Sequence, residues 1–99
     1  MQRVTMMKSN MGNLTTGDCV TIKFPSGSIA YGQLSFFNDS STEGKSFYFA
    51  AYTSILGDVK GHRLYERDDF TVLHKSRYYL DPQDINEILL ELGMPELTI

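Results

Sequence analysis

Residues Gly17 to Tyr52 read GDCVTIKFPSGSIAYGQLSFFNDSSTEGKSFYFAAY, and the fold is organised around this stretch. Apolar and polar side chains alternate from Asp18 to Phe24, which is the period of a strand with one buried face. Pro25 and Gly27 then provide turn chemistry. Two further runs of strand-forming residues follow, Ile29 to Phe37 and Ser46 to Thr53. The stretch therefore predicts three consecutive antiparallel strands.

The second predicted strand contains Gly32, and a glycine weakens a strand unless a bend, a bulge or a close neighbour requires it. We therefore expect a curled sheet. Residues 38–45 are eight polar turn formers, too many for a tight hairpin, and predict a loop. The alternation places Phe36, Phe47 and Phe49 in the core, with the tyrosines and Phe37 on the opposite face.

Two more strands are expected after this meander. Residues 62–67 mix two apolar side chains with charges, which suits an exposed edge strand, and residues 70–74 are rich in β-branched and aromatic side chains. Four to five short strands within about sixty residues are typical of small barrels. The predicted fold class is α+β, mainly β: a small antiparallel, partly open barrel of the SH3-like or OB-like type with a short C-terminal α-helix.

The clearest local signal is Asp81-Pro82-Gln83-Asp84, which places an aspartate at the N-cap and a proline at the first helical position. A helix is predicted from about residue 82 to residue 92, where Gly93 ends it. One side of it is apolar and is expected to dock on the open end of the barrel: Ile85, Ile88, Leu89 and Leu92. The solvent side is acidic and contains Asp84, Glu87 and Glu91.

The 99 residues suit a single domain, predicted to comprise residues 14–99 after a flexible lead-in of residues 1–13. A content of 41% hydrophobic and 21% charged residues is ordinary for a globular protein. No apolar run approaches the roughly 18 residues of a membrane-spanning helix, so no membrane contact is expected. The single cysteine excludes an internal disulfide, and a cytoplasmic location is expected.

Catalytic and cofactor signatures do not occur in the sequence. Cys19, His62 and His74 are the side chains best suited to nucleophilic or acid–base chemistry, but no nucleophile elbow or Cys-His signature accompanies them. The scattered glycines match neither a P-loop nor a dinucleotide fingerprint. We therefore expect no enzyme activity, no cofactor and no metal. A small hydrolase built around His62 or His74 is kept as a third class of function.

The net charge of −3 is the wrong sign for a protein that holds duplex DNA through its phosphates. The tyrosine face nevertheless has two interpretations. Its aromatic rings either form a stacking platform for single-stranded nucleic acid, with basic side chains along its rim, or pack as a second hydrophobic cluster. The platform interpretation uses Tyr31, Tyr48 and Tyr52, with cations drawn from Lys23, Lys45, Arg63, Lys75 and Arg77.

The function predicted first is a small, non-catalytic, cytoplasmic binding or regulatory protein that acts through protein–protein contacts. It would use the acidic helix face, Asp84, Glu87 and Glu91, together with the exposed edge strand. The alternative is a single-stranded nucleic-acid-binding module that uses Tyr31, Tyr48 and Tyr52 with Lys23, Lys45 and Arg77. The oligomeric state is left open, because residues 62–67 or residues 97–99 offer surfaces for pairing two copies.

Overall fold

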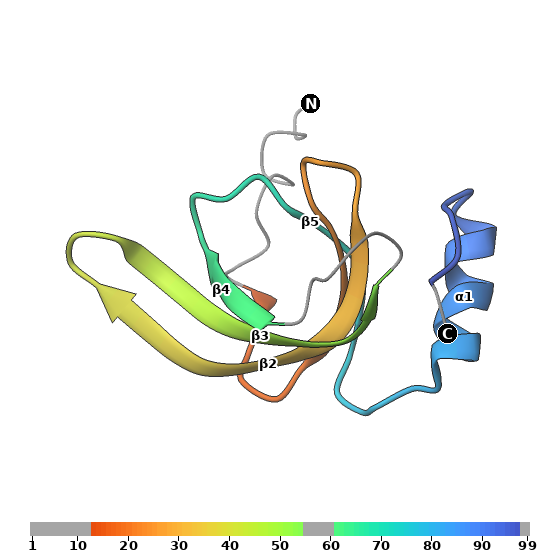
Figure 1. Cartoon of the computed structure of the whole chain (residues 1–99). Coiled ribbons are helices and arrows are strands. Elements are labelled where there is room, and N and C mark those ends of the chain that lie inside the picture. The colour runs from red at the N-terminus through yellow and green to blue at the C-terminus, as the bar shows by residue number, and fades with distance from the viewer. Residues whose placement is uncertain (1–12, 55–60, 98–99) are drawn as a thin grey trace.

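The computed structural model describes residues 13–54 and 61–97 and shows one open antiparallel sheet with a short helix (Figure 1). The mainly β fold with a C-terminal helix is therefore confirmed. The predicted lead-in lies outside the described residues except for Asn13, as does Ile99. The elements are β1 (Cys19–Lys23), β2 (Ile29–Ser40), β3 (Gly44–Ser54), β4 (Gly61–Tyr65), β5 (Thr71–Ser76) and α1 (Pro82–Glu91).

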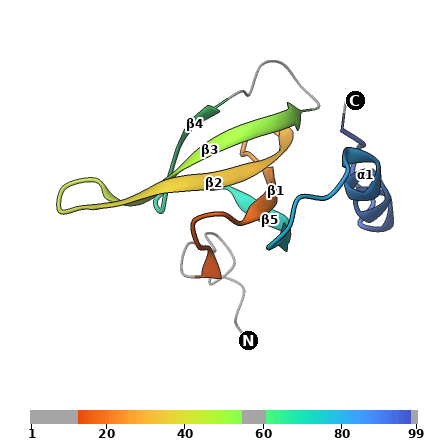
Figure 2. The same cartoon turned by 90° about the horizontal axis from the view of Figure 1, so that it is seen from below.

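The strands are ordered β4-β3-β2-β1-β5, and every neighbouring pair is antiparallel (Figure 2). Strands β1, β2 and β3 form the predicted three-stranded meander, β4 adds to it beside β3, and β5 returns to pair with β1. Strand β4 lies at one edge of the sheet, as predicted from its charged side chains. No helix in the described part of the chain has the length and apolar character needed to cross a membrane.

The β2–β3 hairpin is longer than the sequence suggested. Its ladder continues through Asp39 opposite Lys45 to Ser40 opposite Gly44, so the predicted loop of residues 38–45 is wrong. Asparagine and aspartate disfavour strands only weakly, and pairing with a neighbouring strand overrides that preference. Gly44 has a φ of 85°, which lets the chain reverse tightly. The hairpin consequently extends past the other strands (Figure 1).

The two faces of the sheet bury two separate hydrophobic clusters. The inner face is enclosed by the curl of the sheet, and its cluster draws on all five strands or their flanks: Leu14, Val20, Ile22, Ala30, Leu34, Phe47, Phe49, Leu64 and Phe70, with Val72 packed against them. The cluster on the outer face joins the sheet to the helix: Cys19, Ile29, Tyr31, Ile85, Leu89 and Leu97. Helix α1 therefore covers the outer face, and the expectation that it docks on the open end of the barrel is wrong. The physical reason is that β1 and β2 carry apolar side chains on both faces, so the outer face also needs a cover.

Gly32 is the point at which the sheet bends. The β2–β3 register shifts between Tyr31 and Gly32, so that one extra residue, Tyr52, is accommodated on β3. A Cβ atom on Gly32 would collide with the carbonyl oxygen of Ala50 and lie 2.8 Å from the Cα atom of Ala51. Of the three reasons for glycine left open by the sequence, a close neighbour applies, namely the backbone of β3, together with a bulge in the β2–β3 pairing.

The ends of α1 follow the sequence signals. The Asp81 side chain accepts a hydrogen bond of 2.9 Å from the backbone N–H of Gln83. Gly93 has a φ of 75° and ends the helix. Leu92 was expected in the buried stripe, but it is the C-cap and is half-exposed. The chain then turns back, and Leu97 is buried beside the helix, where its N–H and carbonyl both bond to the side chain of Asn86.

Candidate functional site

The outer face of the sheet has a part that helix α1 covers and a part that it leaves open. The covered part contains Cys19, Ile29 and Tyr31. The open part lies on the β2–β3 hairpin and β4, where Tyr48 pairs with Ser35 on one side and with Arg63 on the other. We call Phe36, Tyr48 and Arg63 the hairpin patch, because they are in contact with one another on this face.

A β-bulge creates the hairpin patch. Ser35 pairs with Tyr48 and Asn38 with Ser46, so two residues of β2, Phe36 and Phe37, stand opposite Phe47. Phe36 is the extra residue and has a φ of 50°, a conformation that side chains other than glycine seldom adopt.

The extra residue reverses which face each following side chain occupies. Phe36 therefore leaves the core and is 73% exposed. The ring of Phe37 lies 4.9 Å from that of Phe47, on the inner side. The predicted positions of Phe36 in the core and of Phe37 on the tyrosine face are both wrong, whereas Phe47 and Phe49 lie in the core as predicted.

Arg63 fixes the bulge from β4. Its guanidinium donates to the carbonyl oxygen of Phe36 at 2.8 Å and to the hydroxyl of Ser46 at 3.3 Å. The rings of Phe36 and Tyr48 meet edge to face, with centroids 6.3 Å apart. Both acceptors of Arg63 are neutral, so these hydrogen bonds orient the positive charge without neutralising it. The patch thus combines two exposed aromatic rings with one oriented cation.

The far end of the hairpin carries both signs of charge. The guanidinium of Arg67 lies 4.1 Å from the centroid of the Tyr65 ring and donates to the backbone carbonyl of Glu43 at 2.9 Å. A hydrogen bond to the Glu43 side chain is the main cause that raises the pKa of Tyr65. The hairpin therefore has an oriented cation at each end, Arg63 at the bulge and Arg67 near the tip.

Tyr31 does not belong to an exposed platform. Its side chain is 1% exposed and lies in the covered part, where its hydroxyl oxygen accepts a hydrogen bond of 2.7 Å from the N–H of Leu80. Burial raises the pKa of Tyr31 to about 12. Of the two interpretations of this face, packing in a second cluster is the one that Tyr31 follows, because α1 covers it.

Tyr52 and Tyr79 close the margin of the covered part. The Tyr52 ring lies 5.3 Å from that of Tyr31 and 5.1 Å from that of Tyr79, which it meets at 88°. Burial is the main cause that raises the pKa of Tyr52, although nearly half of the residue is exposed. The hydroxyl of Tyr52 also hydrogen-bonds to Cys19. The rings are in contact with one another, so they leave no slot for a stacked base.

The three predicted cations lie in different places. Lys23 ends β1 opposite Thr71, whereas Arg77 follows β5 beyond the other end of the same ladder. Lys45 pairs with Asp39 near the tip of the hairpin. The structure therefore does not gather these cations around Tyr48. The cation beside Tyr48 is Arg63, and the aromatic neighbour that the sequence missed is Phe36.

The acidic helix face is present as predicted. Asp84, Glu87 and Glu91 are all exposed, and the helix contains no basic residue. Leu90 lies beside Glu87 at the margin of this face and is 67% exposed. The covered side of the same helix contributes Ile85 and Leu89 to the outer cluster. The solvent side is thus acidic with one exposed aliphatic side chain.

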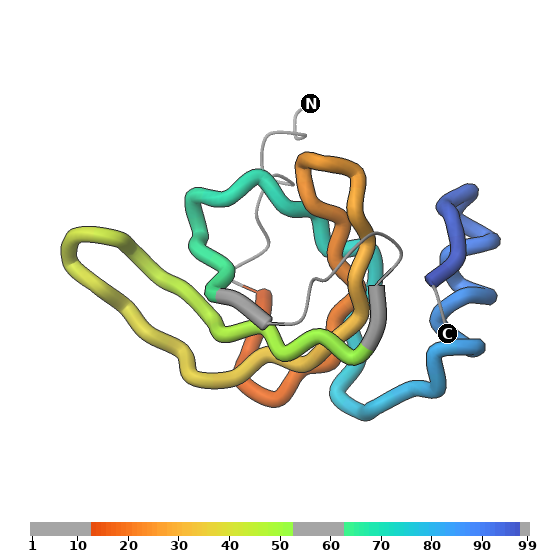
Figure 3. The backbone as a smooth tube through the Cα atoms, viewed as in Figure 1, coloured from red at the N-terminus to blue at the C-terminus, as the bar shows by residue number. Residues whose placement is uncertain are grey.

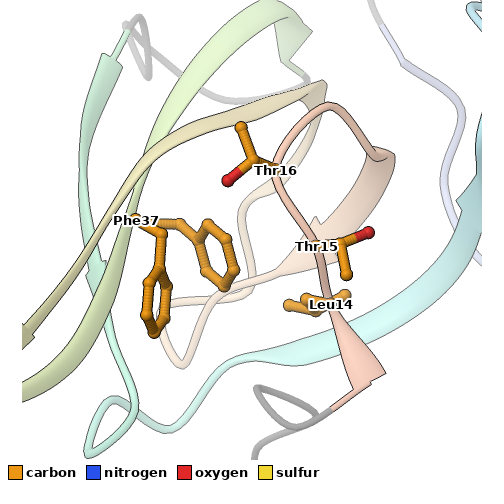
Figure 4. Close-up of a pocket in the computed structure, with 5 residues that line it drawn as sticks. Leu14, Thr15, Thr16 and Phe37 are labelled. Carbon is orange, nitrogen blue, oxygen red and sulfur yellow. The ribbon is translucent and has the colours of Figure 1, made fainter.

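A pocket of about 280 Å³ opens on the inner side of the bulge, at the mouth formed by the curled sheet (Figure 4). Figure 3 follows the backbone from residue 13 through β1 and around the curl of the sheet. The lining is largely apolar and consists of Leu14, Thr15, Thr16, Phe37 and Phe47. None of these described lining residues has a charged or titratable side chain.

Of the three candidate catalytic side chains, the structure describes those of Cys19 and His74. Cys19 is buried, and its thiol is the hydrogen-bond partner of Tyr52. His74 faces Thr21 across the β1–β5 ladder, and His74 Nδ1 and Thr21 Oγ1 have no hydrogen-bond partner among the described residues. The side chain of His62 lies outside the description. Within residues 13–54 and 61–97, no three His, Cys, Asp or Glu side chains gather as a metal site.

Comparison with protein-family models, with curated proteins and with solved structures finds no match to this chain.

Proposed function

We propose that this chain is a small, non-catalytic, cytoplasmic binding protein that acts through protein–protein contacts. The observation that carries the proposal is Phe36, a large apolar side chain that is exposed to water on a left-handed backbone. That conformation costs a residue other than glycine about 1–2 kcal/mol. Burying the side chain of Phe36 against a partner contributes about 1.5–3 kcal/mol, which offsets the strain.

The surroundings of Phe36 suit a protein partner. Aromatic and arginine side chains are the types that contribute most to protein interfaces, and the hairpin patch has two exposed aromatic rings and the half-buried Arg63. Ser46 accepts a hydrogen bond from Arg63 and is fully buried, so the patch is attached to a buried part of the sheet. The acidic helix face, Asp84, Glu87 and Glu91, is the second proposed contact surface, suited to a basic partner.

The proposed architecture is a partly open barrel of the SH3-like or OB-like type. Support comes from the two edge strands, which both contribute to one core. Leu64 of β4 and Val72 of β5 pack with the same inner cluster, and Phe70 from the connection between them is buried there. A curled sheet of this kind holds the helix on its outer face and extends the β2–β3 hairpin past the other strands.

Affinity capture from a lysate of the source cells tests the proposal. The baits are the wild-type protein, Phe36→Asn, the double variant Glu87→Lys with Glu91→Lys, and the control Tyr78→Asn. Tyr78 is 77% exposed and lies outside both surfaces. We expect the control to retain the proteins bound by the wild type and at least one of the other baits to lose them. A capture profile that neither surface variant changes would contradict the proposal.

A single-stranded nucleic-acid-binding module is the second candidate. The observation in its favour is that Tyr48 and Phe36 present neighbouring rings beside Arg63, the combination that binds bases and phosphates. Short single-stranded DNA and RNA would be titrated against the labelled protein at two salt concentrations. Amide shifts around residues 36, 48 and 63 that weaken with salt would support this candidate. No shift with either oligonucleotide would exclude it.

A further inference from the structure

We propose that the hairpin patch of one molecule binds the acidic helix face of a second copy, in a head-to-tail contact. This inference rests on the proposed function and names the partner of the two surfaces. It follows from what each surface presents: exposed Phe36 and Tyr48 with half-buried Arg63 on one, and exposed Glu87, Leu90 and Glu91 on the other.

The two surfaces are complementary in charge. Arg63 is positive, and its hydrogen bonds to Phe36 and Ser46 leave that charge unneutralised. Helix α1 carries Asp84, Glu87 and Glu91 and no base, so its solvent face is purely acidic. An arginine that is already oriented loses little side-chain freedom when it pairs with a carboxylate.

The two surfaces are also complementary in their apolar side chains. Phe36 and Tyr48 are exposed on the hairpin, and Leu90 is exposed beside Glu87, at the margin of the acidic face. A contact between them would cover apolar groups on both molecules, which is the main source of free energy in protein association. Charge pairing at the rim would set the orientation.

The placement of the surfaces excludes an internal contact. The hairpin extends from one end of the molecule and the helix lies at the other, in both views (Figures 1 and 2). A molecule therefore cannot bind its own helix with its own hairpin. Because the two surfaces differ, the contact is heterologous, and repeated contacts produce chains or rings rather than a closed symmetric dimer.

Sedimentation velocity over a range of protein concentrations tests the proposal on the full chain. We expect the average mass of the wild-type protein to rise with concentration. Raising the salt concentration from about 0.05 M to about 0.5 M should weaken the association at least about fivefold, because it screens the charge pairs. Association that does not respond to salt would overturn the proposal.

Two variants each remove one surface. Phe36→Asn removes the exposed ring, and asparagine tolerates a positive φ, so the hairpin is expected to stay folded. The second variant combines Glu87→Lys with Glu91→Lys, and the lysine at 91 also suits the helix C-terminus. Each variant alone should remain monomeric at concentrations where the wild type associates. The controls Tyr78→Asn and Glu96→Lys should associate like the wild type.

An equimolar mixture of the two variants is the decisive measurement. The Phe36→Asn molecule retains an intact helix face, and the lysine variant retains an intact hairpin patch. The mixture should therefore form a dimer and nothing larger, because one complementary pair of surfaces remains. A mixture that stays monomeric, or variants that associate as well as the wild type, would overturn the head-to-tail contact.

The failure of this inference is distinguishable from the failure of the proposed function. A wild-type protein that is monomeric under all conditions, but whose captured proteins depend on Phe36 or on Glu87 and Glu91, has a partner other than itself. That result would overturn self-association and leave the binding function. A wild-type mass that rises only when a single-stranded oligonucleotide is added would assign the hairpin patch to nucleic acid instead.

Discussion

The outer face of the sheet is covered over β1 and the start of β2, and it is open on the hairpin. In the covered part, Tyr31 is buried beneath α1, and its hydroxyl accepts a hydrogen bond from the N–H of Leu80 in the connection before the helix. In the open part, Phe36 and Tyr48 face water beside Arg63. Both parts lie on β2 and carry aromatic side chains. The same residue chemistry therefore becomes core where the chain supplies a cover and a contact surface where it does not.

The local backbone explains the difference as much as the helix does. Tyr31 continues the regular alternation of β2, whereas Phe36 is turned outward by a bulge and a positive φ. Buried Tyr31 serves stability, and its loss should be measured as unfolding free energy. Phe36 contributes little to the fold, and its loss should be measured as binding. The four predictions that follow separate these two kinds of contribution.

Removing the cover should have the largest effect. Leu89→Ala deletes a side chain that is fully buried between α1 and the sheet, and we expect a loss of about 3 kcal/mol in unfolding free energy. Leu90→Ala on the exposed side of the same helix is the matched control and should change it by less than about 0.5 kcal/mol. Urea denaturation of both variants measures the difference. Equal effects would mean that α1 does not bury this side as described.

Gly32→Ala tests the bend between the two parts. The new methyl group would collide with the backbone of Ala50, which cannot move aside as a side chain can. We expect a loss near the upper end of the about 1–3 kcal/mol that overpacking costs. Gly27→Ala is a useful comparison, since its Cβ would meet no atom within 4 Å and only its φ of 98° opposes the change. A smaller loss for Gly32→Ala than for Gly27→Ala would count against the close approach of β2 and β3.

Tyr31→Phe tests the buried hydroxyl through pH. The pKa of Tyr31 is raised from 10.0 to about 12, so the folded state holds the phenol proton more tightly than the unfolded state. The stabilisation that results from this shift is fully present below pH 10. It is lost as the pH rises towards 12, which lowers the unfolding free energy by about 2 kcal/mol.

The phenylalanine variant should lose about 1 kcal/mol at neutral pH, because the Leu80 N–H is left without its acceptor. Its unfolding free energy should then decline less than that of the wild type between pH 10 and pH 12. Chemical denaturation across this range measures both effects. Tyr78→Phe, at an exposed position, should keep the wild-type profile, and a wild-type profile for Tyr31→Phe would disprove the assignment.

The smallest effect is expected on the hairpin. Phe36→Asn should leave the unfolding free energy unchanged or raise it by up to about 1 kcal/mol, because asparagine accepts a positive φ. Phe37→Asn at the neighbouring position should lower it by about 1 kcal/mol, because the Phe37 ring packs on Phe47. Changes of opposite sign in the unfolding free energy at these two consecutive residues would indicate the bulge. If both substitutions destabilise equally, the register in this part of the hairpin is wrong.

Local patterns in the sequence were sufficient for the strands and the helix. Alternation from residue 18 to residue 24 predicted β1 to within one residue at each end, and the Asp-Pro start and Gly93 bracketed α1. These signals depend on a few neighbouring residues, so they can be read without the fold. The glycine inside β2 predicted a bend, a bulge or a close neighbour without deciding among them, because each of these favours glycine in a strand.

The candidate site was less predictable because it depends on contacts between distant segments. The bulge at Phe36 has no glycine or asparagine to mark it, and one extra residue exchanged the faces of Phe36 and Phe37. The acidic residues of α1 needed only the helical period and were placed correctly on its surface. Which face of the sheet α1 would cover depended on side chains far apart in the sequence, such as Cys19, Tyr31 and Leu89.

The hydrogen bond from Leu80 to Tyr31 has a consequence for the kinetics of the molecule. Leu80 lies in the connection before α1, where most amides exchange with solvent quickly, yet its N–H is held by a buried hydroxyl. That amide can exchange only when the connection lifts from the sheet and the helix loosens with it. Its exchange rate would report how often the outer face opens. Measuring this rate does not require unfolding the whole protein. A binding partner that replaced the helix would be detected first at this one amide.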